Sequence, residues 1–172
     1  LPAAIQIYRE TEKSASPHFD DIRNDFARAV GQVAPSLVAA KRVEDAKALV
    51  TVSLEELRKN RVLHPLDIRV QIQQAQLAQL AAQLFQENGY LREAEEALED
   101  ALMKSPKRQQ VLYMLAGVRF QTGRIQDGVA LIIRSIDDDP KITEGWVRLA
   151  TVYRELGEKE KAREVILEGS KR

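Results

Sequence analysis

The chain contains two histidines, His18 and His64, and no cysteine. Catalytic and metal sites need proton-transfer groups or ligands that converge at defined spacing, such as two histidines on one face of a helix. Neither histidine has a second histidine or a glutamate at such a spacing, and each stands beside a predicted helix boundary. We interpret both as solvated or capping residues, and we predict neither a metal ion nor a cofactor.

The acidic run Asp137, Asp138 and Asp139 is the other pattern that suggests a cation site. A calcium loop alternates its oxygen ligands and closes with a glutamate, and this run does neither. It directly precedes Pro140, where we expect a solvated turn. The sequence also lacks a glycine-rich phosphate loop, a nucleophile elbow and a Ser/His/Asp pattern. We therefore predict that the chain has no catalytic activity of its own.

Glutamine forms the most informative polar pattern. Gln76, Gln79, Gln83 and Gln86 follow the spacing i, i+3, i+7, i+10, which places them on one stripe of a helix. Amide side chains donate and accept hydrogen bonds, so this stripe suits an extended peptide backbone or a sugar. The alternative is a neutral, solvated helix face, and the sequence leaves both interpretations open.

Composition restricts the classes of partner. The 172 residues are 44% hydrophobic, and 26 basic side chains balance 26 acidic ones. No net charge draws the chain to nucleic acid or anionic membranes, and the small basic clusters at 58–61 and 104–110 lack interleaved aromatic residues. Apolar runs such as 111–118 are far shorter than the ~18 residues that indicate a membrane span. We predict no nucleic-acid binding and no membrane insertion.

Residues of the same kind recur every 34 positions in the second half of the chain. Gly89, Gly123 and Gly157 keep this interval, and so do Pro106 and Pro140. Each unit predicts two helices, because glycine ends a run of helically spaced apolar residues and proline ends the next one. The further matches are Ala82/Ala116/Ala150, Leu84/Val118/Val152, Ala94/Gly128/Ala162, Leu98/Ile132/Ile166 and Ala101/Ser135/Gly169.

This repeat resembles the tetratricopeptide (TPR) motif W-x2-L-G-x2-Y…A-x3-F…A…P. The best unit matches it through Trp146, Leu149, Ala150, Tyr153, Ala162, Ile166 and Gly169. The resemblance covers residues 75–172 and implies three units, at 75–108, 109–142 and 143–172. It implies an all-α fold, a right-handed superhelical TPR solenoid of antiparallel helix pairs, and a scaffold that binds a protein or peptide.

The motif also assigns roles to three aromatic or basic residues. Trp146 takes the position that packs between the two helices of a unit, so we predict that it is part of the core and not a stacking platform. Arg119 stands where a buried aromatic residue is usual. We expect Phe120 to turn inward in its place and to disturb that helix locally.

In TPR arrays the first helix of each unit lines a concave groove, and the resemblance places the glutamine stripe there. The expected groove residues are Gln76, Gln79, Gln83, Gln110, Tyr113, Gly117, Gln121, Val147, Thr151 and Arg154. Tyr113 is the expected anchor, since tyrosine offers a large apolar area with a polar tip. Gly117 leaves room for a ligand backbone. The lysine and asparagine that clamp a terminal carboxylate in chaperone-tail TPRs are missing.

The first 74 residues repeat less clearly. We expect residues 1–15 to be a linker or a frayed helix and residues 16–74 to be one degenerate, elongated helical repeat. Ser16 and Pro17 begin the first predicted helix, and His64-Pro65 ends the second. The predicted helices are 16–30, 36–60 and 66–88.

A narrower resemblance concerns the stretches 64–80 and 97–123, which look like the TPR region appended to bacterial O-antigen ligase/polymerase family membrane proteins. It implies a soluble extension on the extracytoplasmic side of a membrane protein of cell-surface polysaccharide assembly. The sequence names no partner and does not fix the compartment. Because no clear capping helix follows the last unit, we expect its apolar edge to be covered by further sequence or by a second copy in a homodimer.

Overall fold

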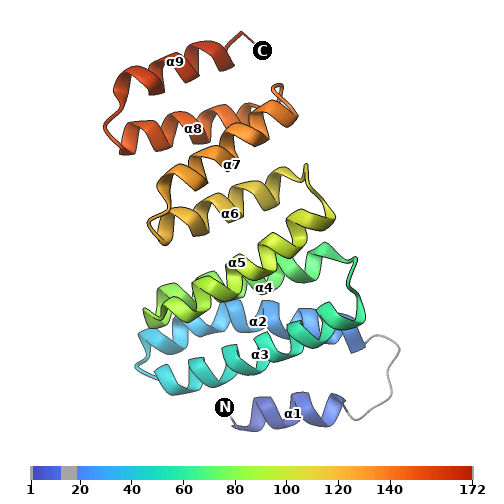
Figure 1. The fold of residues 1–172 in the computed structure, drawn as a ribbon. Helices are drawn as coiled ribbons and strands as arrows, with labels where there is room; N and C mark the ends of the chain where they lie inside the picture. The colour runs from blue at the N-terminus through green and yellow to red at the C-terminus, as the bar shows by residue number, and fades with distance from the viewer. Residues whose placement is uncertain (1, 13–18, 172) are drawn as a thin grey trace. The chain divides into compact units, whose positions relative to one another are not determined.

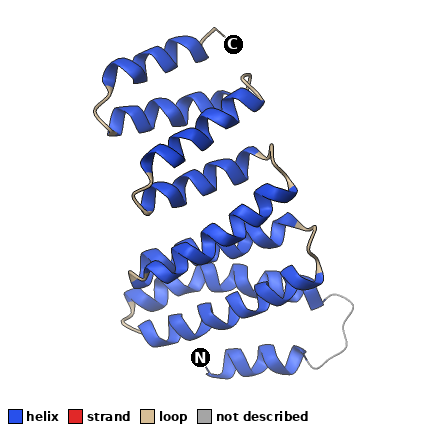
Figure 2. Ribbon diagram, viewed as in Figure 1, coloured by secondary structure: helices blue, strands red, loops and turns tan. Residues whose placement is uncertain are grey.

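The computed structural model describes residues 2–12 and 19–171, and every regular element in these ranges is an α-helix (Figures 1 and 2). The all-α prediction is therefore confirmed. The chain forms two compact units, with the boundary between Lys104 and Ser105. The helices are α1 (Pro2–Glu12), α2 (Phe19–Ala39), α3 (Val43–Leu63), α4 (Ile68–Phe85), α5 (Asn88–Lys104), α6 (Gln109–Gln121), α7 (Ile125–Asp138), α8 (Thr143–Glu155) and α9 (Lys159–Gly169).

In the first unit, α2 and α3 form one antiparallel pair and α4 and α5 form another (Figure 1). α4 packs against both helices of the preceding pair. Small side chains bring α4 and α5 together, because Ala78 and Ala81 on α4 and Ala94, Ala97 and Ala101 on α5 are buried. Larger side chains fill the remaining core of this unit, among them Val50, Leu54, Leu57, Val70 and Leu98.

Helix α1 is held against α2 and α3 by one tyrosine. The Tyr8 ring stacks on Phe26 of α2 with a centroid distance of 4.3 Å. Its hydroxyl donates a hydrogen bond of 2.9 Å to the buried carboxylate of Glu56 on α3. The sequence suggested a linker or frayed helix for residues 1–15, whereas the part that is described, Pro2–Glu12, is helical and has a buried contact. Ser16 and Pro17, the predicted helix start, lie outside the described residues.

The boundary between α2 and α3 differs from the predicted one. The sequence placed one helix at 16–30 and the next at 36–60, but α2 continues through Pro35 to Ala39. Proline lacks an N–H and usually ends a helix, yet here Val30 and Ala34 continue the buried face of α2 up to it. The chain reverses at Lys41 instead, which has a left-handed φ of 60°. The break predicted at His64-Pro65 is confirmed, since α3 ends at Leu63.

In the second unit, α6 pairs with α7, α8 pairs with α9, and α7 packs against α8. Gly123 and Gly157 reverse the chain between the helices of each pair, with φ of 77° and 80°. Most residues avoid this left-handed region for steric reasons, which explains glycine at both positions. In the first unit the equivalent prediction for Gly89 is wrong, because Gly89 lies inside α5 and Gln86 takes the left-handed conformation.

In each helix pair of the second unit, a glycine of the second helix packs against an aromatic ring of the first helix. A Cβ on Gly128 of α7 would lie 2.3 Å from the Phe120 ring, and one on Gly169 of α9 would lie 2.8 Å from the Trp146 ring. Phe120 therefore turns inward as predicted, but α6 is not disturbed and remains helical to Gln121. The core prediction for Trp146 is also confirmed: it packs on the cluster around Leu149, and its Nε1 donates to the Pro140 carbonyl at 2.8 Å.

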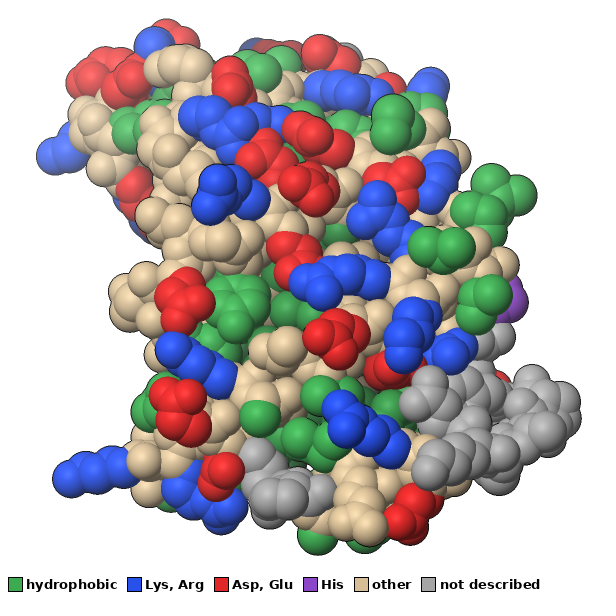
Figure 3. All heavy atoms as spheres, turned by 60° about the horizontal axis from the view of Figure 1, so that its bottom comes forward, with side chains coloured by type: hydrophobic (Ala, Val, Ile, Leu, Met, Phe, Trp, Pro, Cys, Tyr) green, Lys and Arg blue, Asp and Glu red, His purple; other side chains and the backbone are tan. Residues whose placement is uncertain are grey.

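Charged side chains of both signs are interspersed on the molecular surface (Figure 3). Exposed ion pairs of neighbouring residues, such as Arg148–Glu144 and Lys171–Glu168, contribute to this mixed pattern. No helix within the described ranges has both the length and the apolar character needed to cross a membrane. The 26 basic and 26 acidic side chains balance, so the chain has no net charge to create a long-range field of one sign.

We predict that Trp146→Ala lowers the free energy of unfolding by about 3 kcal/mol, the low end of the range for truncating a large aromatic side chain, since the ring is only partly buried. Denaturant unfolding followed by circular dichroism measures this change. Val147→Ala is the matched control, because Val147 is the next residue on α8 and is exposed. Equal unfolding midpoints for the two variants would show that the Trp146 contact contributes little.

The buried carboxylate of Glu56 predicts an acid-sensitive first unit. Burial alone would raise the pKa of Glu56, but hydrogen bonds from Lys59, Arg23 and Tyr8 outweigh it and the pKa is lowered from 4.5. A lowered folded pKa contributes stability that is present above the unfolded value and is lost as the pH falls through the folded value.

Glu56→Gln should therefore cost about 2 kcal/mol at neutral pH, as expected when hydrogen bonds to a charged group are weakened. The difference from wild type should shrink as the pH falls below 4.5. Urea unfolding at a series of pH values measures both effects, and Glu55→Gln on the exposed side of α3 is the control. A penalty that stays constant down to the acid limit would contradict the assigned role of the ionised carboxylate.

Candidate functional site

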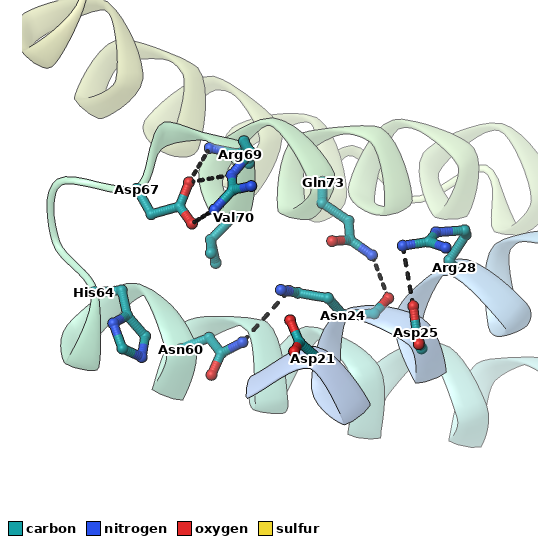
Figure 4. Close-up of a pocket in the computed structure, with 10 residues that line it drawn as sticks. All are labelled: Asp21, Asn24, Asp25, Arg28, Asn60, His64, Asp67, Arg69, Val70 and Gln73. Carbon is teal, nitrogen blue, oxygen red and sulfur yellow. Dashed lines mark hydrogen bonds and ion pairs between the residues drawn. The ribbon is translucent and has the colours of Figure 1, made fainter. Parts of the chain in front are cut away.

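A polar cleft of about 400 Å³ opens in the first unit between α2, the end of α3 and the start of α4 (Figure 4). Helix α2 contributes four residues at i, i+3, i+4 and i+7, which is one helical face. The lining residues are Asp21, Asn24, Asp25 and Arg28 from α2, Asn60 and His64 from the end of α3, and Asp67, Arg69, Val70 and Gln73 from the start of α4. Val70 is the only aliphatic member, so the cleft suits a polar ligand.

The α3–α4 connection builds one wall of this cleft. His64 is the C-cap residue of α3, and its backbone N–H bonds to the Asn60 carbonyl. Asp67 is the N-cap of α4 and accepts hydrogen bonds from the Arg69 backbone N–H at 3.1 Å and from its guanidinium at 2.7 and 2.8 Å. The hydrogen bond from the Arg69 side chain lowers the pKa of Asp67 despite its partial burial. The carboxylate is therefore ionised at neutral pH.

Hydrogen bonds of amide side chains join α2, α3 and α4 at the floor of the cleft. Gln73 on α4 donates to the backbone carbonyl of Asn24 on α2. Asn60 on α3 donates to the Asn24 side-chain oxygen at 3.4 Å, and its own oxygen accepts from Arg23 at 3.2 Å. In Figure 4 these side chains converge from three helices on one place. Each of these bonds joins two helices, so together they hold α2, α3 and α4 to one another at the cleft.

Partly exposed ion pairs join α3 to α5, and glutamines of α4 bond to the same carboxylates. Arg58 of α3 makes two hydrogen bonds to Glu93 of α5, at 2.9 and 2.7 Å, and Gln74 of α4 donates to the same carboxylate. One turn later, Arg61 and Gln71 repeat this arrangement around Asp100. We call these two sets of contacts the polar ladder. It fixes the position of the start of α4 between its two neighbours.

The acidic and histidine residues singled out from the sequence do not converge. Asp139 accepts a hydrogen bond from the Lys141 backbone in the turn after α7, and Asp138 faces Lys107 and Arg134 at 3.9 Å. His18 lies outside the described residues. Among the side chains that are described, no group of three or more His, Cys, Asp or Glu residues could hold a metal ion.

In the first unit, the predicted groove residues lie on α4 beside the cleft but not in it. Gln76 and Gln83 are exposed and Gln79 is half-buried. Gln73, one turn before Gln76, is the member of the same stripe that lines the cleft. Sequence reasoning missed it because the repeat was taken to begin at residue 75. It missed Asn24 and Arg28 because α2 carries no recognisable motif.

In the second unit, the predicted residues lie on α6 and α8. Tyr113 is the one buried member of this set, at 7% exposed. The Arg148 guanidinium covers the Tyr113 ring at 4.6 Å from its centroid. Tyr113 therefore does not offer the large open apolar area expected of an anchor, since α8 already occupies it. Gln110, Gln121, Val147 and Arg154 are exposed, and Gly117 and Thr151 are half-buried.

Two family models, both described as tetratricopeptide repeat, match residues 85–143 and 143–171. Together they begin within α4 and end beyond α9, and each of the helix pairs they cover shows the predicted turn, small-residue contact and terminating proline or glycine. The chain belongs to the tetratricopeptide repeat family. TPR arrays are scaffolds for protein interactions and are generally non-catalytic, which agrees with the class predicted from the sequence.

Solved TPR structures resemble the fold over most of the chain. A MamA structure from Desulfovibrio magneticus RS-1 is 13% identical, covers 96% of this chain and 93% of its own, and has a TM-score of 0.56. A structure described as MamA is 16% identical over 74% of this chain and 71% of its own, with a TM-score of 0.53. PilF of Pseudomonas aeruginosa is 16% identical over 87% and 77%, with a TM-score of 0.50.

These identities are low, so the likeness to the solved structures concerns the TPR fold alone. No curated protein matches the sequence. The TPR models begin at residue 85, although α2 and α3 form an equivalent helix pair before that point. The residues that line the polar cleft, from Asp21 to Gln73, precede the part of the chain that the TPR models match.

Proposed function

We propose that this TPR protein is a non-catalytic scaffold that binds a partner protein, and that each unit by itself offers the exposed faces of its first helices to a peptide segment: α4 in the first unit, and α6 and α8 in the second. The observation that supports this most is the run of amide and other uncharged side chains that remain accessible on these helices, from Gln76 and Gln83 to Gln110, Gln121 and Val147. Amides can satisfy the donors and acceptors of an extended backbone.

A peptide selected from a random phage-displayed library on the wild-type protein provides a defined ligand. We expect Gly117→Arg in the second unit, or Gln83→Arg in the first, to weaken its binding by roughly tenfold or more, because a bulky charged side chain blocks the contact in the unit that holds the peptide. Fluorescence anisotropy measures the affinities, and circular dichroism checks that the variants fold. Lys159→Ala on α9 is the control. Loss of binding in the control with retention in both other variants would place the site elsewhere.

The face of α8 and α9 suggests, in addition, that two copies associate. Ile166 is 60% exposed, whereas Ile132 and Leu98, at the same motif position in the two preceding repeats, are 2% and 0% exposed. None of the described residues covers this position in the last repeat. An apolar side chain at a position built to be covered favours contact with another apolar surface, and we propose that a second copy supplies it.

Sedimentation equilibrium over a range of concentrations tests this association. We expect the wild type to dimerise and Ile166→Asp to weaken the dimer by roughly tenfold or more, since a charge is placed in an apolar contact. Arg163→Asp changes an exposed residue of the same helix and serves as the control. A wild type that remains monomeric throughout would reject the homodimer.

The alternative function, an accessory TPR domain of an O-antigen ligase/polymerase-type membrane protein, rests on the stretches 64–80 and 97–123 alone. The TPR models and the fold do not bear on it. A transmembrane region in the reading frame that encodes this chain would support it, and an encoded protein without one would reject it.

A further inference from the structure

Helix α1 is attached to the first unit through a single buried side chain. Of residues 3–11, whose side chains are described, Tyr8 alone is buried, at 6% exposed, and the neighbouring Ile7 is 64% exposed. α1 is the outermost of the described helices of this unit (Figure 1). A helix of 11 residues is marginal by itself in water. Segments with few buried contacts open at a lower free energy than the unit around them, so we expect α1 to detach while α2 and α3 stay folded.

The position that the Tyr8 side chain occupies is formed by α2 and α3, and its chemistry matches a phenol. We call it the tyrosine site and define it by the ring of Phe26, the carboxylate of Glu56 and the guanidinium of Arg23. The Tyr8 ring stacks on Phe26 with an interplanar angle of 20°. Its hydroxyl and the Arg23 Nε both donate to Oε2 of Glu56, at 2.9 and 3.0 Å. The stacked ring thus recognises an aromatic group, and the carboxylate recognises its hydroxyl.

The acceptor of the tyrosine site does not depend on α1. Arg23 of α2 and Lys59 of α3 also donate hydrogen bonds to Glu56, so the carboxylate keeps two cationic partners when α1 is displaced. Burying a carboxylate is costly, and an apolar residue would hold α1 through a phenylalanine equally well. The carboxylate adds selectivity, because a site built to bind a hydroxyl strongly rejects a ligand that lacks it. The site therefore distinguishes tyrosine from phenylalanine.

We propose that the tyrosine site docks a helical, tyrosine-bearing segment of a partner protein, and that α1 is the chain's own competing occupant. The partner's tyrosine stacks on Phe26 and donates to Glu56 while α1 leaves. A tethered occupant competes at an effective concentration on the order of millimolar, so α1 excludes weak ligands and admits only a segment that outcompetes it. The site lies on α2 and α3 and not on the exposed faces of α4, α6 and α8, so this inference goes beyond the function proposed above.

A peptide with the sequence of residues 2–12 is the defined ligand for the test. It is titrated into the 15N-labelled full chain carrying Tyr8→Ala, and binding is followed through the backbone signals of Phe26 and Glu56. We expect these signals to shift, and we expect the wild-type chain to bind the peptide at least tenfold more weakly, because its α1 competes. Replacing the tyrosine of the peptide with alanine should abolish binding. Failure of the Tyr8→Ala chain to bind, or equal affinity for the two peptides, overturns the proposal.

A double-mutant cycle tests the selectivity for tyrosine. The Tyr8→Ala chain should bind the tyrosine peptide roughly tenfold more tightly than its phenylalanine analogue, the difference expected for a hydrogen bond to a charged acceptor. Adding Glu56→Gln should remove most of this preference, whereas Glu55→Gln, at an exposed position of the same helix, should retain it. A preference that does not depend on Glu56 contradicts the assigned recognition.

Hydrogen exchange in the wild-type chain tests displacement without any substitution. As the peptide is added, exchange of the α1 amides should become faster and exchange in α3 should not change. If the Phe26 and Glu56 signals shift while α1 exchange stays constant, α1 is not a competing occupant and the proposal is wrong. Gly117→Arg and Gln83→Arg should leave the affinity for this peptide unchanged, so failure here and failure of the proposed scaffold function are distinguishable.

Discussion

The close approach of the two helices in a pair is the constraint on which each unit depends. A pair of short helices can bury its shared face only if one helix presents a surface without bulk. In the second unit Gly128 and Gly169 provide this surface, and the rings of Phe120 and Trp146 occupy the space that a Cβ would need. In the first unit buried alanines, such as Ala94 and Ala101, have the same role. Protein interiors are densely packed, so these positions tolerate no larger residue without displacing a neighbour.

In the first unit, polar contacts also fix how far neighbouring helices are shifted along one another. The polar ladder joins α3 to α5 through glutamines of α4, with Glu93 and Asp100 as the shared acceptors. Sliding α4 by one turn would remove the amide hydrogen bond that each of these partly buried carboxylates accepts, which is costly. The buried Oε1 atoms of Gln71 and Gln74 have no hydrogen-bond partner, so the ladder is held through their donors alone. Val70 and Gln73, which adjoin these glutamines on α4, line the polar cleft.

These two kinds of contact also decide which surfaces are left for a partner. Side chains that pack between helices, including Tyr113 under Arg148, are already committed to internal packing. What remains accessible is of two kinds: the amide-rich faces of first helices, and the polar cleft of the first unit. On the face of the molecule that Figure 3 shows, positive and negative side chains are interspersed. Affinity for a partner must then come from shape, hydrogen bonds and a few apolar anchors, which is typical of a binding scaffold.

The sequence by itself determined the repeat of 34 residues, the reversals at Gly123 and Gly157, and the place of Trp146 in the core. Each follows from local chemistry: glycine alone adopts the left-handed turn at no steric cost, and an aromatic residue at helical spacing faces its neighbour. Only the tertiary structure decided that Pro35 lies inside α2, that Gln86 and not Gly89 reverses the chain, and that α8 covers Tyr113. The polar cleft, too, could be found only from the tertiary structure. Its residues come from three helices that are brought together by packing across long stretches of chain, and no local pattern in the sequence specifies that packing.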